Sequence, residues 1–172
     1  MADMHGAKEL VRAFLLQVRS GAHPEYADRF LAARVLAHQV QAENPVIVER
    51  SPHDYAEHVR QMTDLYGDFT IEIEELIAEG DRVYARWSQH GRHDGTVDGR
   101  PPTGAPLTQL TSAVYRVADD RITEYWIQID RAGLDAQLHS GGANDNQPHK
   151  GASASAGSTS FWPRSRTTCW HP

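Results

Sequence analysis

The sequence predicts an α+β domain, and two observations on residue spacing support this fold class. Apolar residues recur at helical spacing in the first third of the chain, over 6–20 and again over 51–66. From residue 68 onward they recur at alternate positions, which is typical of long strands with one covered face. A block of helices followed by a block of strands indicates helices packed on one side of an antiparallel sheet.

The helical part is expected to contain three helices and one short strand. The first helix, 6–20, is followed by a shorter one at 24–33 and by a strand at about 35–41. The third helix, 51–66, has the clearest start, because Ser51 is a favoured N-cap residue and a proline follows it.

Four long strands are expected in the second part. Two of them lie between 68 and 93 around a turn at 79–81, with a bulge in the first. After a loop at 94–106, the third and fourth strands are expected at 107–117 and 121–130.

The fourth strand ends in a carboxylate, Asp130, just before a short helical turn. Alternation places Asp130 on the same strand face as Trp126 and Gln128. Large apolar groups occur on both faces, so we expect the strand to be central and covered on both sides. From these residues alone, Asp130 either caps the following turn or is a desolvated carboxylate with a chemical role.

Length and composition fit one domain with an appended tail. The chain has 172 residues, a hydrophobic fraction of 40% and a net charge of −6, which gives no electrostatic support for nucleic-acid binding. With one cysteine, no signal peptide and no long apolar run, we expect a cytoplasmic protein without a membrane span. We expect the folded domain to be 1–138 and the tail, 139–172, to be disordered because its composition is Gly- and Ser-rich.

Four motifs in the strand region resemble the SnoaL-like polyketide cyclases of the nuclear-transport-factor-2-like superfamily. They are Gly80-Asp81-Arg82-Val83 with Arg86-Trp87, then Gly91-Arg92-His93-Asp94-Gly95, Pro101-Pro102-Thr103-Gly104, and Trp126 with Asp130. The resemblance covers residues 6–138. It implies a cone-shaped sheet that encloses a pocket with the N-terminal helices, and a homodimer formed through the outer sheet face.

The resemblance also implies a reaction and its residues. Asp130 would be the general acid/base and His93 its polar partner, acting without a cofactor on a small hydrophobic carbonyl compound. Desolvation would raise the pKa of such a carboxyl group, and a nearby imidazole could steady a developing enolate. We expect these side chains to line the pocket: Trp87, Trp126, Gln128, His38 and Tyr55.

Several alternatives stay open at this point. The same pocket could bind an apolar molecule without catalysis, or it could be filled by its own aromatic side chains. An epoxide-hydrolase-like site would need Arg92 and Asp94, which alternation places opposite His93. His38 taken alone fits a structural, hydrogen-bonded histidine better than a ligand contact. We expect no metal site, since His90 and His93 point to opposite faces of their strand.

Overall fold

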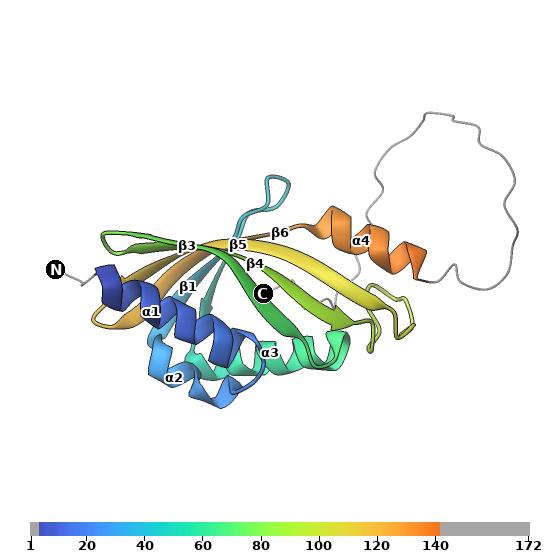
Figure 1. Cartoon of the computed structure of the whole chain (residues 1–172), viewed down its shortest axis with the longest axis horizontal. Helices are drawn as coiled ribbons and strands as arrows, with labels where there is room; N and C mark the ends of the chain where they lie inside the picture. Colours follow the sequence, from blue (N-terminus) through green and yellow to red (C-terminus); the bar gives the residue numbers. More distant parts are fainter. Residues whose placement is uncertain (1–3, 142–172) are drawn as a thin grey trace, which may run out of the picture.

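The computed structural model describes residues 4–141, and these residues form a curved six-stranded sheet with helices on its concave side (Figure 1). The helical segments before the long strands are α1 (Met4–Phe14), a π-helical turn η1 (Leu15–Arg19), a 3-10 turn η2 (Pro24–Tyr26), α2 (Ala27–Phe30) and α3 (Pro52–Tyr66). None of the helices among these residues is long and apolar enough to cross a membrane.

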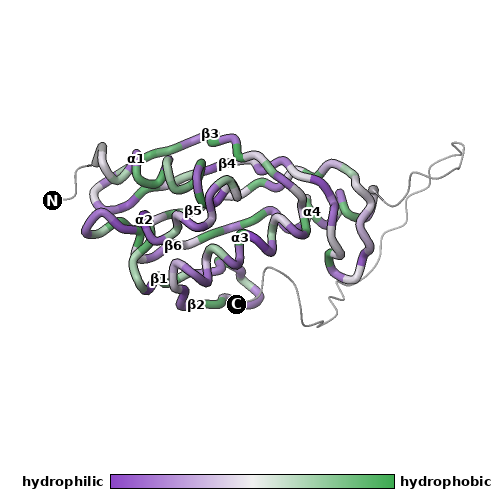
Figure 2. Tube along the Cα trace, turned by 90° about the horizontal axis from the view of Figure 1, so that it is seen from below, coloured by the Kyte–Doolittle hydropathy of each residue, from purple (hydrophilic) through white to green (hydrophobic). Residues whose placement is uncertain are grey.

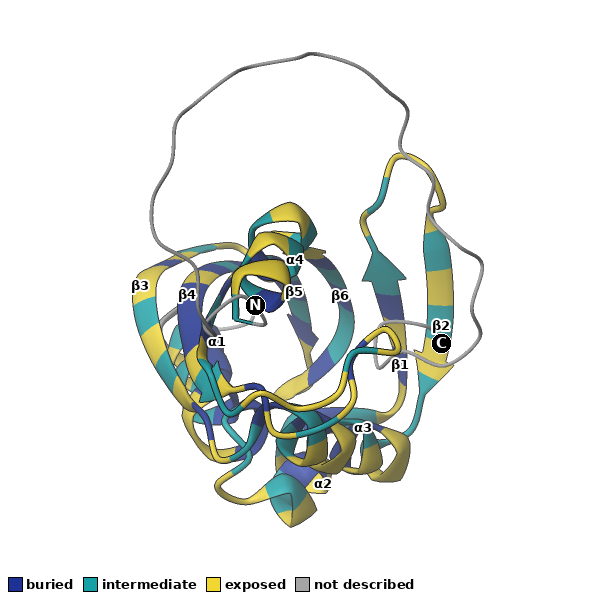
Figure 3. Ribbon diagram, turned by 90° about the vertical axis from the view of Figure 1, so that its right-hand side faces the viewer, coloured by how far each residue is buried: buried dark blue, intermediate teal, exposed yellow. Residues whose placement is uncertain are grey.

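The strands are ordered β2-β1-β6-β5-β4-β3 across the sheet. Their bounds are β1 (Leu31–Gln39), β2 (Val46–Arg50), β3 (Thr70–Glu79), β4 (Arg82–Arg92), β5 (Pro106–Ala118) and β6 (Arg121–Ile129). Neighbouring strands are antiparallel except β1 and β6, which run parallel. Strands β3 to β6 curve around an interior that the helices close from below, so the α+β cone is confirmed (Figure 3).

Helix α3 begins and ends as its sequence predicts. The Ser51 side chain accepts a hydrogen bond from the Asp54 N–H at 3.2 Å, and Asp54 Oδ2 accepts one from the Ser51 N–H at 3.0 Å. Gly67 follows the last turn with φ +65°, a conformation that favours glycine. Hydrophobic and hydrophilic segments alternate along α3 (Figure 2), and its buried residues include Tyr55, Val59 and Met62.

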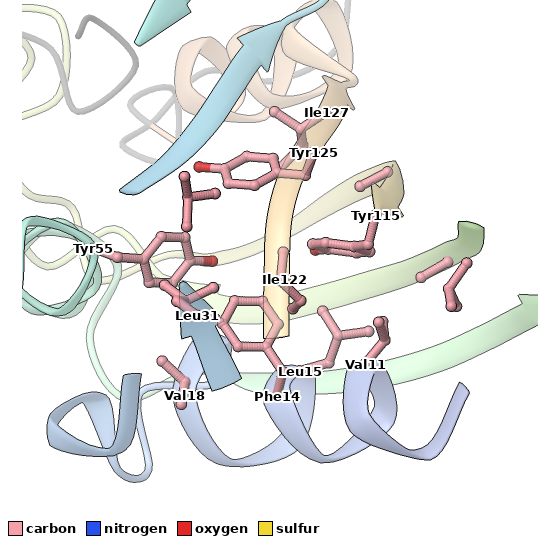
Figure 4. Close-up of a cluster of buried hydrophobic side chains, with 14 of the residues drawn as sticks. Val11, Phe14, Leu15, Val18, Leu31, Tyr55, Tyr115, Ile122, Tyr125 and Ile127 are labelled. Carbon is pink, nitrogen blue, oxygen red and sulfur yellow. The ribbon is translucent and has the colours of Figure 1, made fainter. Parts of the chain in front are cut away.

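The main core lies between the helices and the inner face of the sheet. Four aromatic rings meet there in a closed cycle: Phe14 to Tyr55 at 5.3 Å, Tyr55 to Tyr125 at 6.3 Å, Tyr125 to Tyr115 at 5.8 Å and Tyr115 to Phe14 at 5.8 Å (Figure 4). All four residues are buried. Aromatic pairs at these separations stabilise a core beyond the area they bury.

Three local features differ from the sequence expectation. Strand β2 is not predicted from the sequence, because it has only five residues and its side chains are partly buried or exposed. The helix expected at 24–33 ends at Phe30, because Leu31 already pairs with Ile122 as the start of β1. The helical turn after Asp130 is a full helix, α4 (Arg131–Ser140). The bulge expected in β3 is present between Ile73 and Glu75. Most of the predicted tail lies outside the described residues.

Candidate functional site

Strand β4 carries a run of polar side chains into the interior of the cone. Trp87, Gln89 and His93 are each at most 3% exposed, as strict alternation from Val83 onward predicts. Three of their atoms, Trp87 Nε1, Gln89 Oε1 and His93 Nε2, are buried with no hydrogen-bond partner among the described residues. Buried polar atoms are nearly always partnered in folded proteins, so these three mark a candidate ligand-binding interior.

A second strand extends this polar surface. Gln109 on β5 lies opposite Gln89, and Thr111 lies opposite Trp87. Gln109 Nε2 donates a hydrogen bond to Thr111 Oγ1 at 3.1 Å, and both residues are buried. We call Trp87, Gln89, Gln109 and Thr111 the inner polar layer. Sequence reasoning missed Gln109 and Thr111, although alternation along 107–117 could have placed them on the inner face.

The loop at Pro101–Gly104 fixes the orientation of His93. The His93 carbonyl accepts hydrogen bonds from the Thr103 and Gly104 N–H groups at 3.1 and 2.9 Å, and its own N–H donates to the Ala105 carbonyl at 2.9 Å. His93 Nδ1 lies 3.2 Å from Thr103 Oγ1. Thr103 Oγ1 also accepts from the Ala105 N–H at 3.3 Å, which leaves its own proton free to donate to Nδ1. This arrangement favours the tautomer with its proton on the unpartnered Nε2.

Asp130 lies at the mouth of the cone rather than in its interior. Its side chain is exposed and accepts a hydrogen bond from the Gly133 N–H at 2.9 Å, so it caps α4. Of the two interpretations that the sequence left open, the structure therefore shows the capping contact. A catalytic role for Asp130 stays a prediction.

The structure does not bring Asp130 and His93 together. The Asp130 N–H bonds to the Leu110 carbonyl, and Leu110 pairs with Ser88, so His93 lies five residues farther along β4. At the usual rise per strand residue this offset is roughly 16 Å. The length of helix α4 gives a similar separation. Its ten residues span roughly 15 Å between Asp130 at its start and Gly141, which lies next to Thr103, just after its end.

Three residues expected in the pocket lie on the outer sheet face instead. His38 stacks on Trp126 at 4.8 Å between ring centroids, and His38 Nε2 lies 2.7 Å from Glu124 Oε1. Arg116 also pairs with Glu124 and lies over the Trp126 ring. Gln128 is exposed on the same face. Alternation correctly grouped Trp126 with Gln128, but both faces of β6 carry large side chains, and alternation cannot say which face is inside.

Two open grooves adjoin Asp130 at the mouth. One, of about 320 Å³, lies between the end of β1 and the start of α4, and its lining includes Gln39, Ile127 and Ile129. The other, of about 250 Å³, lies on the outer side beside Arg86 and Leu110. Each groove touches one buried residue of the inner face, Ile127 in the first and Thr111 in the second.

Tyr55 lies on the inner face, as expected, beside two arginines that sequence reasoning missed. Arg19 is 2% exposed; its Nη1 lies 2.8 Å from Met62 Sδ, and its guanidinium carbon lies 5.9 Å from the centre of the Trp87 ring. Arg50 has a buried Nε without a partner among the described residues. Arg19 follows Leu15 by four helical positions, a spacing that could have placed it on the buried face.

Burial shifts the titration of the groups around these arginines. Desolvation raises the pKa values of Tyr55, Tyr115 and Tyr125 above their usual range, so their hydroxyls stay protonated. Desolvation, with added repulsion from Arg50 and Arg19, lowers the pKa of His58 to about 3. At neutral pH the three tyrosines and His58 are therefore uncharged.

The residues needed for other site types are dispersed. Arg92 and Asp94 are both exposed, while His93 between them is buried. His90 is exposed and lies 3.1 Å from Thr108 Oγ1 on the outer side. Among residues 6–141 no cluster of three or more His, Cys, Asp or Glu side chains has a metal-binding arrangement.

Comparison with known proteins relates the whole described fold to one family. The family described as SnoaL-like polyketide cyclase matches residues 9–138. A candidate polyketide cyclase from Acidithiobacillus ferrooxidans is 27% identical, with a TM-score of 0.71 over 82% of this chain and 99% of that one. IdmH, a candidate polyketide cyclase from Streptomyces antibioticus, is 24% identical, with a TM-score of 0.66 over 77% and 98% of the two chains.

An epoxide hydrolase of limonene-epoxide-hydrolase type from M. tuberculosis shares the fold at 20% identity, with a TM-score of 0.59 over 80% of this chain and 92% of that one. Among curated proteins, none matches the chain. The family and its structural neighbours support a cyclase-type role. Because the family match extends over most of the chain, the protein belongs to the SnoaL-like polyketide cyclase family.

Proposed function

We propose that the protein is a cyclase- or isomerase-type enzyme that performs acid/base chemistry without a cofactor on a small hydrophobic carbonyl compound. The observation that carries this proposal is the environment of His93. Its imidazole is buried, one nitrogen is held by Thr103, and the other has no partner among the described residues. Such an imidazole is preorganised to donate a hydrogen bond to a carbonyl oxygen and to stabilise the enolate that forms there.

Asp130 is proposed to move a proton at the mouth of the cone. It lines the open groove between β1 and α4 together with Ile127 and Ile129. Because roughly 16 Å along the strands separates it from His93, a single carbonyl group does not contact both. The proposal therefore favours a ligand with two or more carbonyl groups, one near His93 and one near the mouth.

A proton-exchange assay tests this function. The aryl ketone 2-tetralone is incubated with the purified full chain in D2O, and loss of the protons next to its carbonyl is followed by NMR. We expect the wild type to accelerate exchange and His93→Asn to slow it by about 100-fold, the lower range for loss of an acid/base group. In this assay solvent takes the proton and His93 stabilises the enolate, so Asp130→Asn, which keeps an oxygen for the α4 cap, should leave exchange of this single-carbonyl ketone unchanged.

The alternative function is ligand binding without catalysis. The separation of Asp130 from His93 favours it, because the two groups are not arranged around one reacting carbon. Binding of 2-tetralone with no acceleration of exchange would support this alternative. If 2-tetralone neither binds nor exchanges faster, that result would contradict both the catalytic function and the binding function.

A further inference from the structure

The strongest unexplained feature of the interior is a buried positive charge. Arg19, at the end of η1, is 2% exposed and lies against Met62 and the Trp87 ring. No carboxylate of residues 6–141 lies within 4.0 Å of its guanidinium group, whereas Arg34, Arg86, Arg100 and Arg116 all have acidic partners. An unpaired buried charge destabilises a fold. The thioether of Met62 and the indole ring of Trp87 carry no negative charge, so they offset little of the cost of burying Arg19.

The groups next to Arg19 add donors rather than negative charge. Trp87 Nε1 and Arg50 Nε are buried donors that have no hydrogen-bond partner in the part of the chain that the structure describes. Electrostatic coupling of Arg19 and Arg50 to the same two residues, Tyr55 and His58, places both guanidinium groups around one part of the core. The buried tyrosines Tyr55, Tyr115 and Tyr125 stay neutral, so they offer hydroxyl groups and no negative charge to pair with the arginines.

We propose that Arg19, with Trp87 beside it and Arg50 in the same part of the core, binds the carboxylate group of an aromatic or otherwise apolar organic acid. A guanidinium group matches the planar, two-oxygen geometry of a carboxylate and forms strong charge-assisted hydrogen bonds with it. The aromatic cycle of Phe14, Tyr55, Tyr115 and Tyr125 provides an apolar wall for the rest of the molecule (Figure 4).

This inference deepens the proposed function and rests on it for the location of the ligand. It adds that the carbonyl compound is an acid, held at its carboxylate by the inner arginines. The neutral surface of the inner polar layer, where Gln89 offers an unpartnered acceptor, then faces the uncharged part of the ligand.

The test compares two probes that differ in charge. Benzoate and its neutral analogue benzamide are titrated into the purified full chain by calorimetry and by NMR of the Trp87 indole N–H, assigned with Trp87→Phe. We expect benzoate to bind about tenfold more tightly or better, the equivalent of one charge-assisted hydrogen bond, and to shift the indole signal. Equal binding of the two probes, or no binding of benzoate, would overturn the inference.

A variant and a matched control separate binding from structure. Arg19→Met keeps the length of the side chain and removes its charge, so we expect benzoate affinity to fall about tenfold and the unfolding temperature to stay the same or rise. Arg86→Met removes a charge on the outer face, beside the groove at Leu110, and should leave benzoate binding unchanged. A lower unfolding temperature for Arg19→Met with unchanged benzoate affinity would assign Arg19 a structural role instead.

The indole signal of the wild type provides a readout that needs no arginine variant. Benzoate binding is measured without turnover and the exchange assay uses a neutral ketone, so failure of this inference and failure of the proposed function give different results.

Discussion

At the scale of single residues, His93 depends on the far end of the loop that follows it, at Thr103–Ala105. Thr103 holds both the carbonyl and the imidazole of His93, and the paired prolines before Thr103 stiffen the loop. An imidazole oriented in this way keeps its tautomer, and only then is Nε2 reliably a donor toward the interior.

Replacing Thr103 by valine should therefore release His93 without removing it. We expect Thr103→Val to lower the free energy of unfolding by about 1 kcal/mol, the usual contribution of one hydrogen bond, and to slow ketone exchange. Denaturant unfolding and NMR of the histidine nitrogens measure the two effects.

The chain offers a matched control for this change. On the outer side of β4 and β5, Thr108 Oγ1 lies 3.1 Å from Nδ1 of the exposed His90. Thr108→Val should change neither stability beyond a few tenths of a kcal/mol nor the exchange rate. Equal effects of the two substitutions would contradict a special role for Thr103.

The inner residues of the site could be predicted from sequence, and the outer ones were misplaced for a definable reason. Alternation along 83–93 places Trp87 and His93 on one face, and both are buried in the structure, although Ser88 between them is buried as well. On β6, Trp126 was expected inside, but Arg116, His38 and Glu124 provide polar partners that make an outer position stable. Arg116 and His38 come from other strands, β5 and β1, so local spacing along β6 does not reveal them.

At the scale of elements, α4 links the mouth of the cone to the His93 loop. Its first turn is capped by Asp130, and its apolar residues Leu134 and Leu138 pack with Met62 and Leu107. Gly141, just after the helix, approaches Thr103 and Ala105. The sequence indicated only a short turn here, because the apolar pattern of α4 is limited to these two leucines.

Capping and proton transfer by Asp130 can be separated with two substitutions. Asp130→Ala should lower the free energy of unfolding by about 1 kcal/mol, whereas Asp130→Asn should change it by only a few tenths, because asparagine also caps helices. Urea unfolding of both variants measures this difference. Equal destabilisation would mean that the charge, rather than the hydrogen bond to Gly133, stabilises α4.

His58 on helix α3 should cause the free energy of unfolding to fall in mild acid. Its pKa is about 3 in the folded protein and about 6.5 when exposed, so the unfolded chain binds this proton more readily between those values. Stability from this group is full above about pH 6.5 and is lost as the pH falls, by at most about 2 kcal/mol at pH 5. Between pH 5 and 7 the free energy of unfolding, measured by denaturant unfolding at each pH, should change less for His58→Gln than for the wild type.

The exposed His90 is the control for this titration. His90→Gln should reproduce the pH dependence of the wild type, because the His90 side chain is 47% exposed. If the free energy of unfolding of His58→Gln fell between pH 5 and 7 as steeply as that of the wild type, the loss of stability in mild acid would come from other groups.

At the scale of the whole molecule, the convex face of the sheet is a candidate dimer surface. Large apolar side chains are exposed there, among them Leu36 at 41% and Leu110 at 49%, around the stacked pair of His38 and Trp126. Contiguous apolar surface with an aromatic centre is typical of protein interfaces. We propose that two copies of this chain pack through this face.

Light scattering after size exclusion tests the dimer. The wild type should have twice the mass of one chain, and Leu110→Arg should reduce this to one, since a buried unpaired charge opposes association. Leu16→Arg changes an apolar residue of similar exposure, 46%, on the helical side and should remain dimeric. A wild type of single-chain mass would contradict the proposal.

The one parallel pair in the sheet also governs the order in which the molecule can form. Strand β1 lies between β2 and β6, and Leu31 pairs with Ile122, so a segment near the start of the chain is completed by one near its end. Contacts between such distant segments close long loops and slow folding. On the ribosome, β1 must remain without its β6 partner until β6 emerges, and during that interval its uncovered edge and apolar face are the surfaces that a chaperone would meet.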